Sequence, residues 1–373
     1  MMRPLEGIRI LDFSTLLPGP MATLVLAEAG AEVIKIERPG RGDEMRSYAP
    51  RFGDDSVNFA LLNRGKRSVE IDLKGADVLD RLRPLIESAD IVVEQFRPGV
   101  MDRVGLGYEA LSSINDRLIY CAITGYGQSG PLANIAAHDL NYVAQAGMLG
   151  LSAGADGSPV LPPALIADIA GGTYPAIVNI LLALRQRDRT GKGCKLDIAM
   201  ADNLFTFLYW AIGNGQVEGK WPVSGGELVT GGSARYQIYR TRDNKFIAAA
   251  PLEDKFWANF IEAIGAPKEL LDDSQSPESV KAHIQQILAA ETAEHWVDCF
   301  KGKDVCCAVV ASMKDAMGDP HFHARGIFSR ELANGDTHIT ALPVPVAPQF
   351  RGQNLRDGYP ALGEANAEFG LGK

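Results

Sequence analysis

The chain begins with an alternation of β-rich and helix-like segments, and this alternation restricts its fold more than any other feature. The predicted strands are 8–13, 32–36, 90–93 and 118–123, and the predicted helices are 20–29 and 75–89. Gly30 predicts the end of the first helix. Strands that alternate with helices are typical of a parallel sheet with helices on both faces. We therefore expect a Rossmann-like α/β domain.

The first strand-to-helix turn argues against a dinucleotide cofactor. Residues 14–20 read STLLPGP, which lacks the G-x-G-x-x-G pattern. Without those glycines the backbone is not free to approach a pyrophosphate. We expect a Rossmann-like sheet that does not bind NAD.

The pattern changes after about residue 201, and a chain of 373 residues favours two structural units. We expect a large α/β domain over 1–201 and 325–373, a linker over 202–225 rich in glycine at its end, and a smaller α+β domain over 226–324. The tail carries Pro343, Pro345 and Pro348 and few periodic segments, so it is expected to wrap the first domain or a partner subunit.

Composition excludes several classes of protein. There are 37 Lys and Arg against 46 Asp and Glu, and the net charge of −9 argues against nucleic acid. The apolar stretch 177–184 is much shorter than the roughly 20 residues that cross a bilayer, and residues 1–6 lead into a strand without an apolar signal core. The 5 cysteines form no C-x-x-C pair, so neither disulfides nor a metal site are indicated. We expect a cytoplasmic protein without membrane or nucleic-acid partners.

Cations recur beside turn residues in the first half of the chain. Arg38 follows the second predicted strand, Asn63 and Arg64 precede another β-rich segment, and Phe96 and Arg97 follow the strand at 90–93. Ligands of open parallel sheets bind outside the carboxyl ends of the strands. A guanidinium group suits phosphate oxygens, and Phe96 could lie against a purine. The alternative is that these are solvated loop arginines.

A glycine-containing loop leads into a second candidate feature. Residues 124–131 read TGYGQSGP, and His138 and Asp139 begin a predicted helix that runs to Gly147. The free amide groups of a helix start can donate to an anion. The alternative is that His138 and Asp139 only cap the helix.

Asp168 is the third feature, because it interrupts the apolar run 164–170. A carboxylate in such a setting is costly unless it is paired or functional, and its pKa tends to rise. Asp168 is therefore a candidate acid, base or nucleophile. The alternative is an N-cap for a helix that begins near Gly172.

Taken together and in this order, these motifs resemble the family III CoA-transferases, the CaiB/BaiF group. The resemblance covers essentially the whole chain. It is carried by 30–39 (GAEVIKIERP), 63–68 (NRGKRS), 96–99 (FRPG), 125–131 (GYGQSGP) and 318–321 (GDPH).

The resemblance implies one of two chemistries. In the transferases an aspartate, here Asp168, forms a mixed anhydride with the acyl group and then a thioester with CoA. The α-methylacyl-CoA racemases keep the aspartate as an acid/base and add a histidine 30 positions earlier, which matches His138 in the run HDLNY (168 − 138 = 30). They also carry a glutamate in the small domain that orients the histidine, and this matches Glu253. The match favours a racemase.

A racemase needs a base and an acid on opposite faces of the α-carbon, and His138 and Asp168 would fill these roles. Glu253 would hold the imidazole tautomer, and the amide of Asp139 would donate to the enolate oxygen. The resemblance further implies CoA as part of the substrate and no other cofactor. The CoA-binding positions that it implies are Arg38, Asn63, Arg64, Phe96, Arg97 and Arg103. It also implies an interlocked homodimer, with Glu253 acting in cis or across the subunit boundary.

Overall fold

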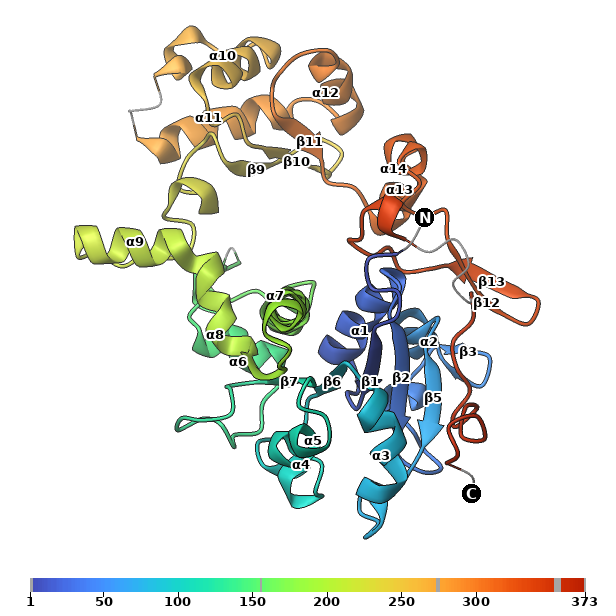
Figure 1. The fold of residues 1–373 in the computed structure, drawn as a ribbon. Helices are drawn as coiled ribbons and strands as arrows, with labels where there is room; N and C mark the ends of the chain where they lie inside the picture. The colour runs from blue at the N-terminus through green and yellow to red at the C-terminus, as the bar shows by residue number, and fades with distance from the viewer. Residues whose placement is uncertain (1–2, 155, 273–275, 352–356, 372–373) are drawn as a thin grey trace. The chain divides into compact units, whose positions relative to one another are not determined.

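The computed structural model describes residues 3–154, 156–272, 276–351 and 357–371. The chain forms two compact units, each of which is described here by itself (Figure 1). Unit 1 comprises Met1–Ala146, Pro162–Phe207 and His323–Lys373, and unit 2 comprises Gly147–Leu161 and Leu208–Phe322.

Unit 1 is built on a six-stranded sheet in which every neighbouring pair is parallel. Its strands, in spatial order, are β5 (Arg67–Glu70), β2 (Glu32–Glu37), β1 (Arg9–Asp12), β6 (Ile91–Glu94), β7 (Ile119–Thr124) and β8 (Cys194–Ala199). All residues of β6 and β7 are buried, as expected for strands covered on both faces. The predicted α/β class with a large parallel sheet is confirmed.

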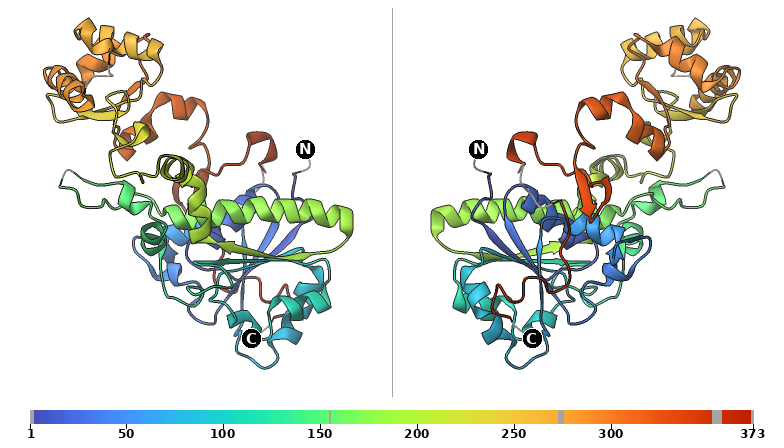
Figure 2. Two further views of the ribbon diagram at one scale, coloured as in Figure 1. Left: turned by 90° about the vertical axis from the view of Figure 1, so that its left-hand side faces the viewer. Right: turned by 90° about the vertical axis from the view of Figure 1, so that its right-hand side faces the viewer.

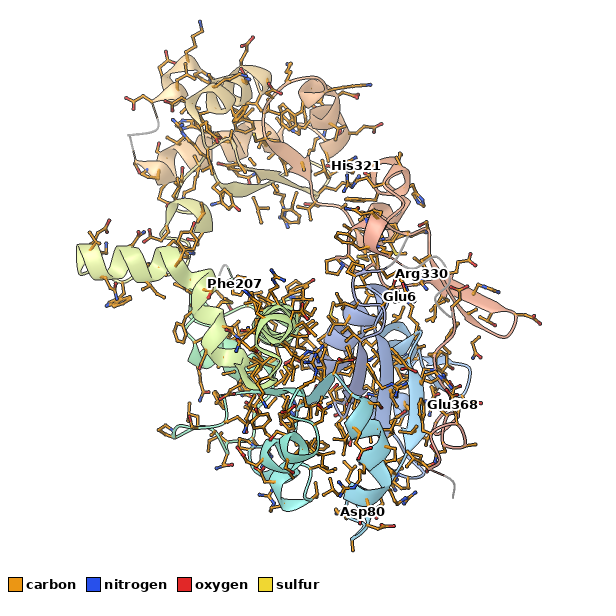
Figure 3. All side chains as sticks on the ribbon, in the orientation of Figure 1. Glu6, Asp80, Phe207, His321, Arg330 and Glu368 are labelled. Carbon is orange, nitrogen blue, oxygen red and sulfur yellow. The ribbon has the colours of Figure 1, made fainter. Side chains whose placement is uncertain are left out.

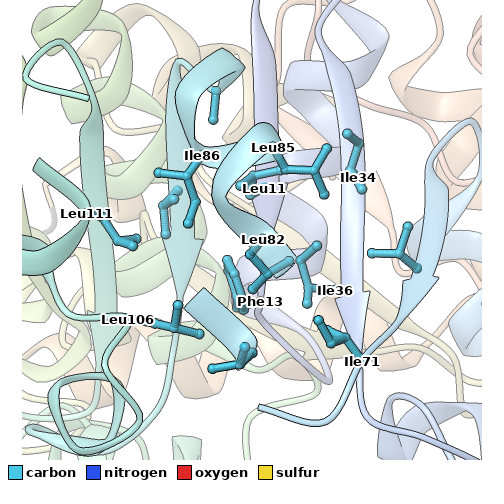
Figure 4. Close-up of a cluster of buried hydrophobic side chains, with 14 of the residues drawn as sticks. Leu11, Phe13, Ile34, Ile36, Ile71, Leu82, Leu85, Ile86, Leu106 and Leu111 are labelled. Atoms are coloured by element: carbon cyan, nitrogen blue, oxygen red, sulfur yellow. The ribbon is translucent and has the colours of Figure 1, made fainter. Parts of the chain in front are cut away.

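Helices cover both faces of this sheet (Figure 2). On one face, α1 (Pro18–Glu28) contacts α7 (Tyr174–Thr190), and on the other lie α3 (Val78–Ser88) and α5 (Tyr108–Ile114). Figure 4 shows the second interface, where Leu82, Leu85 and Ile86 of α3 pack against Leu11 and Ile34 of the sheet. The i, i+3, i+4 spacing of the three α3 residues places them on one helix face.

The strand order reverses between β1 and β6. From this point the chain proceeds outward through β2 and β5 on one side and through β7 and β8 on the other. In open parallel sheets, ligands bind outside the carboxyl ends of the strands at such a reversal. The turns that follow β1 and β6 are therefore the first place to look for a site.

The helical segment that contains α7 is longer than the sequence indicated. It runs over Ala167–Thr190, and among the described residues this one segment has the length and composition to span a membrane. One face packs as a core helix does, since Ala176, Ile180 and Ala183 are buried. Its last turn is fixed by an ion pair of 2.9 Å between Arg187 and Asp90.

The C-terminal tail lies on unit 1. After a hairpin of β12 (Glu331–Asn334) and β13 (Thr337–Thr340), Val344 and Val346 pack against α1. Figure 3 labels Arg330, which pairs with Glu28 of α1. The tail also contributes to the core on the α3 face of the sheet, where Leu371 clusters with buried residues of α3.

Unit 2 holds a three-stranded antiparallel sheet in the order β11 (Cys307–Val309), β10 (Phe246–Ala249), β9 (Gln237–Arg240). The helices that share its core are α10 (Asp254–Ala263), α11 (Pro277–Ala289) and α12 (Ala293–Phe300). Trp257, Phe260 and Trp296 are among the buried residues of that core. Elsewhere in the chain lie several short elements, namely α2 (Val57–Asn63), α4 (Val100–Arg103), α13 (Met313–Gly318), α14 (Pro320–Ala324), β3 (Arg51–Phe52) and β4 (Asp55–Ser56).

The sequence predicts a linker over 202–225 that begins with a helix over 203–212. That segment is largely helical, with the end of α8 (Met200–Leu204) and the whole of α9 (Tyr209–Glu218). The chain reverses at Gly219, and the indole of Trp221 packs so closely on α9 that a Cβ at Gly215 would lie 2.3 Å from the ring. The glycine therefore makes room for a ring. The unit boundary falls after Phe207, and 147–161 clusters with unit 2.

Candidate active site

A cavity of about 400 Å³ opens where the strand order of unit 1 reverses. Turns after three parallel strands line it, at 15–18 after β1, 95–98 after β6 and 124–126 after β7. Further walls come from 133–138, Asn141, Tyr142, Asp168 and Met200. We refer to it as the switch-point cavity, and it brings His138, Asp168, Phe96 and Arg97 together.

His138 stands at the start of α6 (Asp139–Gln145), on the wall of this cavity. Its backbone is extended, and its N–H donates to Oδ1 of Asn141 over 3.0 Å. His138 thus occupies the N-cap position, as the structural alternative predicted, and it is also an exposed side chain in the candidate site. The two interpretations of the sequence are compatible.

Asp168 lies in a turn of π-helix, Ala167–Thr173, that continues directly into α7. It is therefore inside a helical segment, and the alternative that it caps a helix near Gly172 is wrong. Burial, followed by the nearby charge of Asp139, raises the pKa of Asp168 to about 7. A carboxyl group with this pKa exchanges its proton readily at neutral pH.

The π-turn is held in place by α8. The side-chain amide of Asn203 donates to the carbonyl of Gly171 over 2.8 Å. A Cβ at Gly171 would lie 2.2 Å from the carbonyl oxygen of Met200, so no larger residue fits without displacing the turn. Single π-turns inside α-helices frequently mark functional sites. The packing of α8 thus sets where Asp168 stands.

Asp139 lies directly behind Asp168. Its side chain is 6% exposed, and its Oδ1 accepts a hydrogen bond of 2.9 Å from the backbone N–H of Asp168. Tyr142, one turn along α6, lines the cavity and donates from its hydroxyl to the carbonyl of Ala137 over 2.8 Å. Burial and the negative charge of Asp168 raise the pKa of Tyr142 to about 12, so its hydroxyl stays protonated.

The turn after β1 contains features that the sequence did not reveal. Leu16 lines the cavity with a φ of 61°, a conformation that is costly for a branched residue. Its N–H donates to the carboxylate of Asp43 at 3.1 Å, and Asp43 pairs with the fully buried Lys35 at 2.9 Å. The signal in the sequence was a lysine inside the otherwise apolar core of β2.

The remaining predicted cations lie apart from the switch-point cavity. Arg38 lines a second cavity in unit 1, of about 800 Å³, together with Arg41 and Arg51. It is half exposed and pairs with Glu44 over 3.0 Å. Arg103 is exposed at the end of α4. Neither lines the switch-point cavity.

Asn63 and Arg64 are not placed where a ligand could reach them. Asn63 is fully buried and its amide donates to the carbonyl of Phe59 over 3.0 Å. Arg64 is 2% exposed, pairs with Glu28 at 2.9 Å and donates to the carbonyl of Leu342 at 2.9 Å. The structure thus corrects their assignment, because these contacts join α2 to α1 and to the tail.

Glu253 belongs to unit 2, where it precedes the first turn of α10 as an exposed side chain. The site that unit 1 forms by itself therefore consists of His138, Asp139 and Asp168, with Phe96 and Arg97 at its wall. An acidic group that titrates near neutrality, an imidazole and a guanidinium in one cavity define an α/β enzyme site.

Comparisons with known proteins identify the family. A family model described as CoA-transferase family III matches residues 5–366. The acetyl-CoA:oxalate CoA-transferase of Acetobacter aceti is 32% identical over 98% of this chain and 94% of its own length. The α-methylacyl-CoA racemase of Homo sapiens is 33% identical over 98% and 92%. The crystal structure of Rv3272 from M. tuberculosis superposes with a TM-score of 0.84 at 29% identity, covering 99% of each chain. The chain belongs to CoA-transferase family III, whose members here include transferases and racemases.

Proposed function

We propose that this chain is an acyl-CoA racemase that interconverts (R)- and (S)-2-methylacyl-CoA thioesters. The observation that carries the proposal is Asp168, a carboxyl group with a pKa of about 7 in the same cavity as His138. Inversion at an acidic carbon needs one group to take a proton and another to return one, and both work best near the operating pH. The pair meets that requirement without a metal or a redox cofactor.

In one direction, neutral His138 takes the α-proton, and the electrons of the C–H bond move onto the thioester oxygen as an enolate. Protonated Asp168 then delivers its own proton to the opposite face of the carbon. This leaves an imidazolium and a carboxylate, which the reverse reaction or exchange with water resets. The backbone amide of Asp139 would stabilise the enolate oxygen. Glu253, from the same chain or a partner, would stabilise the imidazolium.

CoA is the partner that the cations would hold, and no further cofactor is needed. Phe96 and Arg97 line the switch-point cavity, while Arg38 lines the second cavity of unit 1. Arg103 would add a contact at the rim. We expect the enzyme to act in the cytoplasm, without membrane or nucleic-acid partners.

The competing function is acyl-CoA:carboxylate CoA transfer. Here ionised Asp168 attacks the thioester carbonyl, CoA leaves as a thiolate, and the thiolate then attacks the aspartyl carbonyl of the mixed anhydride, which expels the donor acid as a carboxylate and gives an aspartyl-CoA thioester. The acceptor carboxylate attacks this thioester and releases the thiolate, which attacks the acceptor carbonyl of the new anhydride to form the product thioester and regenerate the carboxylate of Asp168. The transferase named above supports this alternative. A nucleophile must be ionised, however, and burial followed by the charge of Asp139 raises the pKa of Asp168 to about 7, which suits a group that both gives and takes a proton. We therefore favour the acid/base role.

The deciding experiment incubates a 2-methylacyl-CoA of single configuration with enzyme in heavy water and no acceptor acid. The proposal predicts deuterium at C2 together with loss of configuration. We expect His138→Ala and Asp168→Asn each to lower the rate by roughly 10²- to 10⁴-fold. His283→Ala, an exposed histidine of α11, and Asp80→Asn, an exposed aspartate of α3, are the matched controls. A wild-type enzyme without exchange would overturn the proposal.

Hydroxylamine separates the two chemistries. It should inactivate a transferase only when acyl-CoA is present, because it attacks the aspartyl intermediates, whereas a racemase should be indifferent to it. Inactivation that depends on acyl-CoA, together with absence of exchange, would establish the transferase.

The CoA sites are tested by Arg97→Ala. Because Arg97 would bind the part shared by all acyl-CoA substrates, KM should rise by a similar factor for each, with kcat little changed. A KM that changes for one acyl chain and not for others would place Arg97 at the acyl group instead.

We also propose that the protein is an interlocked homodimer. Support comes from the outer face of α7, where Val178, Leu181 and Leu182 are 44–62% exposed. Contiguous apolar surface of this kind is typical of a protein interface. When the protein is diluted, its activity should fall in parallel with the fraction of dimer that sedimentation measures. An active monomer would contradict the assignment.

A further inference from the structure

Asp139 joins the two proposed catalytic groups. It follows His138 in the chain, and its carboxylate accepts the backbone N–H of Asp168 over 2.9 Å. His138 and Asp168 lie on different elements, α6 and the π-turn, so this bond directly links the segments that carry them. With 6% of its surface exposed, Asp139 has little contact with water.

The carboxylate of Asp139 lies at a favourable place for a negative charge. It lies in the first turn of α6, where the helix dipole favours a negative charge, and it accepts an amide hydrogen bond. No ion pair to this carboxylate occurs among the residues that the structure describes. No described cation therefore neutralises the Asp139 carboxylate, which lies beside Asp168.

We propose that the side chain of Asp139 is a positioning residue that holds the backbone of Asp168, and with it the Asp168 carboxyl group, in place relative to His138. This inference rests on the proposed acid/base role of Asp168. It concerns the carboxylate of Asp139, which is distinct from the backbone amide assigned to the enolate.

Other charged or titratable groups surround the same turn. Those that line the cavity are His138, Tyr126, Tyr142 and Arg97. Those on elements packed against the turn are Glu28 of α1, Tyr174, Arg185, Arg187, Asp188 and Arg189 of α7, Cys194, Lys195 and Asp197 of β8, and Asp202 of α8. Burial first, and then the charge of Asp139, raise the pKa of Asp168 to about 7. Asp139 thus combines the hydrogen bond and the electrostatic effect.

Two substitutions separate these effects. Asp139→Asn keeps an acceptor oxygen and removes the charge, whereas Asp139→Ala removes both. The pKa of Asp168 is measured in the full chain by ¹³C NMR of carboxyl-labelled aspartate, with the resonance assigned by its absence from Asp168→Asn. We expect Asp139→Asn to lower this pKa by roughly one unit, since a neighbouring like charge is lost. Asp80→Asn, which removes an exposed charge at the surface position labelled in Figure 3, should leave it unchanged.

Turnover supplies the second readout. The pH–kcat profile of Asp139→Asn should move to lower pH by the same amount, and Asp139→Ala should lose a further roughly tenfold to hundredfold in kcat at nearly constant KM. An unchanged Asp168 pKa in Asp139→Asn, or full kcat in Asp139→Ala, would overturn the inference. The NMR titration needs no turnover, so a chain without racemase activity would refute the proposed function and leave the positioning role measurable.

Discussion

At the scale of single residues, unit 1 uses buried charge in two ways. Lys66 is fully buried, and its ammonium donates to Asp12 at 3.0 Å, Thr23 at 2.7 Å and Asn63 at 2.9 Å. Asp168, by contrast, has no hydrogen bond to its carboxyl group from any residue that the structure describes. The Lys66 network fixes the sheet, whereas the half-buried carboxyl group of Asp168 lines a cavity and is available for chemistry.

The stability of the protein should depend on pH through Asp168. Because its pKa in the folded chain, about 7, lies above the ordinary value of 3.8, ionisation favours the unfolded state as pH rises. The stabilising effect of Asp168→Asn should therefore grow with pH from about 4 to about 7, the interval between the two pKa values, and level off above that. At about 1.4 kcal/mol per pKa unit, the gain relative to wild type increases by about 3 kcal/mol from pH 5 to pH 8.

Urea denaturation at several pH values, followed by far-UV circular dichroism, measures this difference. Asp80→Asn should give a difference that does not vary with pH, because its side chain is 78% exposed. A pH-independent gain for Asp168→Asn would mean that Asp168 titrates normally.

Removing a buried cation should be far more damaging than removing a surface one. Lys66→Met leaves the carboxylate of Asp12 buried and without its partner, which costs roughly 3–5 kcal/mol. Lys192→Met breaks an exposed pair with Asp116 and should cost at most about 1 kcal/mol. Denaturation midpoints of the two variants test the contrast, and equal effects would contradict a structural role for the Lys66 network.

At the scale of elements, the sequence predicted what local periodicity can encode. The strands and helices of the first 130 residues alternate in a regular way, and the structure places them within a few residues of the prediction. Local patterns could not reveal that Arg64 is paired with Glu28, 36 positions away, so its side chain was assigned to a ligand. Gly215 was likewise assigned to a linker. The ring that covers it belongs to Trp221, which reaches it only after the chain reverses at Gly219, and a local pattern does not reveal such a reversal.

The candidate site shows the same division. His138 was selected from the glycine-containing loop before a helix start, Asp168 from the apolar run around it, and both from the family resemblance, but the π-turn was not predicted. That turn depends on α8, which approaches Gly171 from 32 positions along the chain. Asp139 was selected for its backbone, whereas its side-chain bond to Asp168 became visible only in three dimensions.

The π-turn gives an element-scale prediction. Gly171→Ala would place a methyl group against the carbonyl of Met200 and must shift the turn that carries Asp168. We expect a loss of kcat of roughly a hundredfold, because small displacements of a catalytic group are expensive. Gly213→Ala in α9, where the added methyl group meets open space, should be neutral or stabilising by up to about 1 kcal/mol. Isotope exchange and thermal melting of both variants provide the comparison.

At the scale of the whole molecule, unit 1 is assembled from three separate stretches of chain. The last stretch is an integral part of it. The ring of Tyr359 lies against Phe52 and Phe59, and its hydroxyl donates to the carbonyl of Phe52 over 2.5 Å. The carboxylate of Glu28 forms ion pairs with Arg64 of the first stretch and with Arg330 of the last stretch.

Weakening the tail should therefore destabilise the sheet. Tyr359→Ala removes an aromatic side chain between two others and should cost roughly 3 kcal/mol. Tyr359→Phe loses only the hydrogen bond and should cost about 1 kcal/mol. Far-UV circular dichroism in urea measures both, and a Tyr359→Ala variant as stable as wild type would show that the tail is only a surface covering.

The discontinuity of unit 1 also matters while the chain is being made. Leu371 is buried in the same core as residues of α3, so that core cannot be completed until Leu371 has left the ribosome. Most of unit 2, Leu208–Phe322, is by then already available to fold. During synthesis the apolar faces of α1 and α3 must wait for their final covering, and this is the interval in which the nascent protein most needs protection from aggregation.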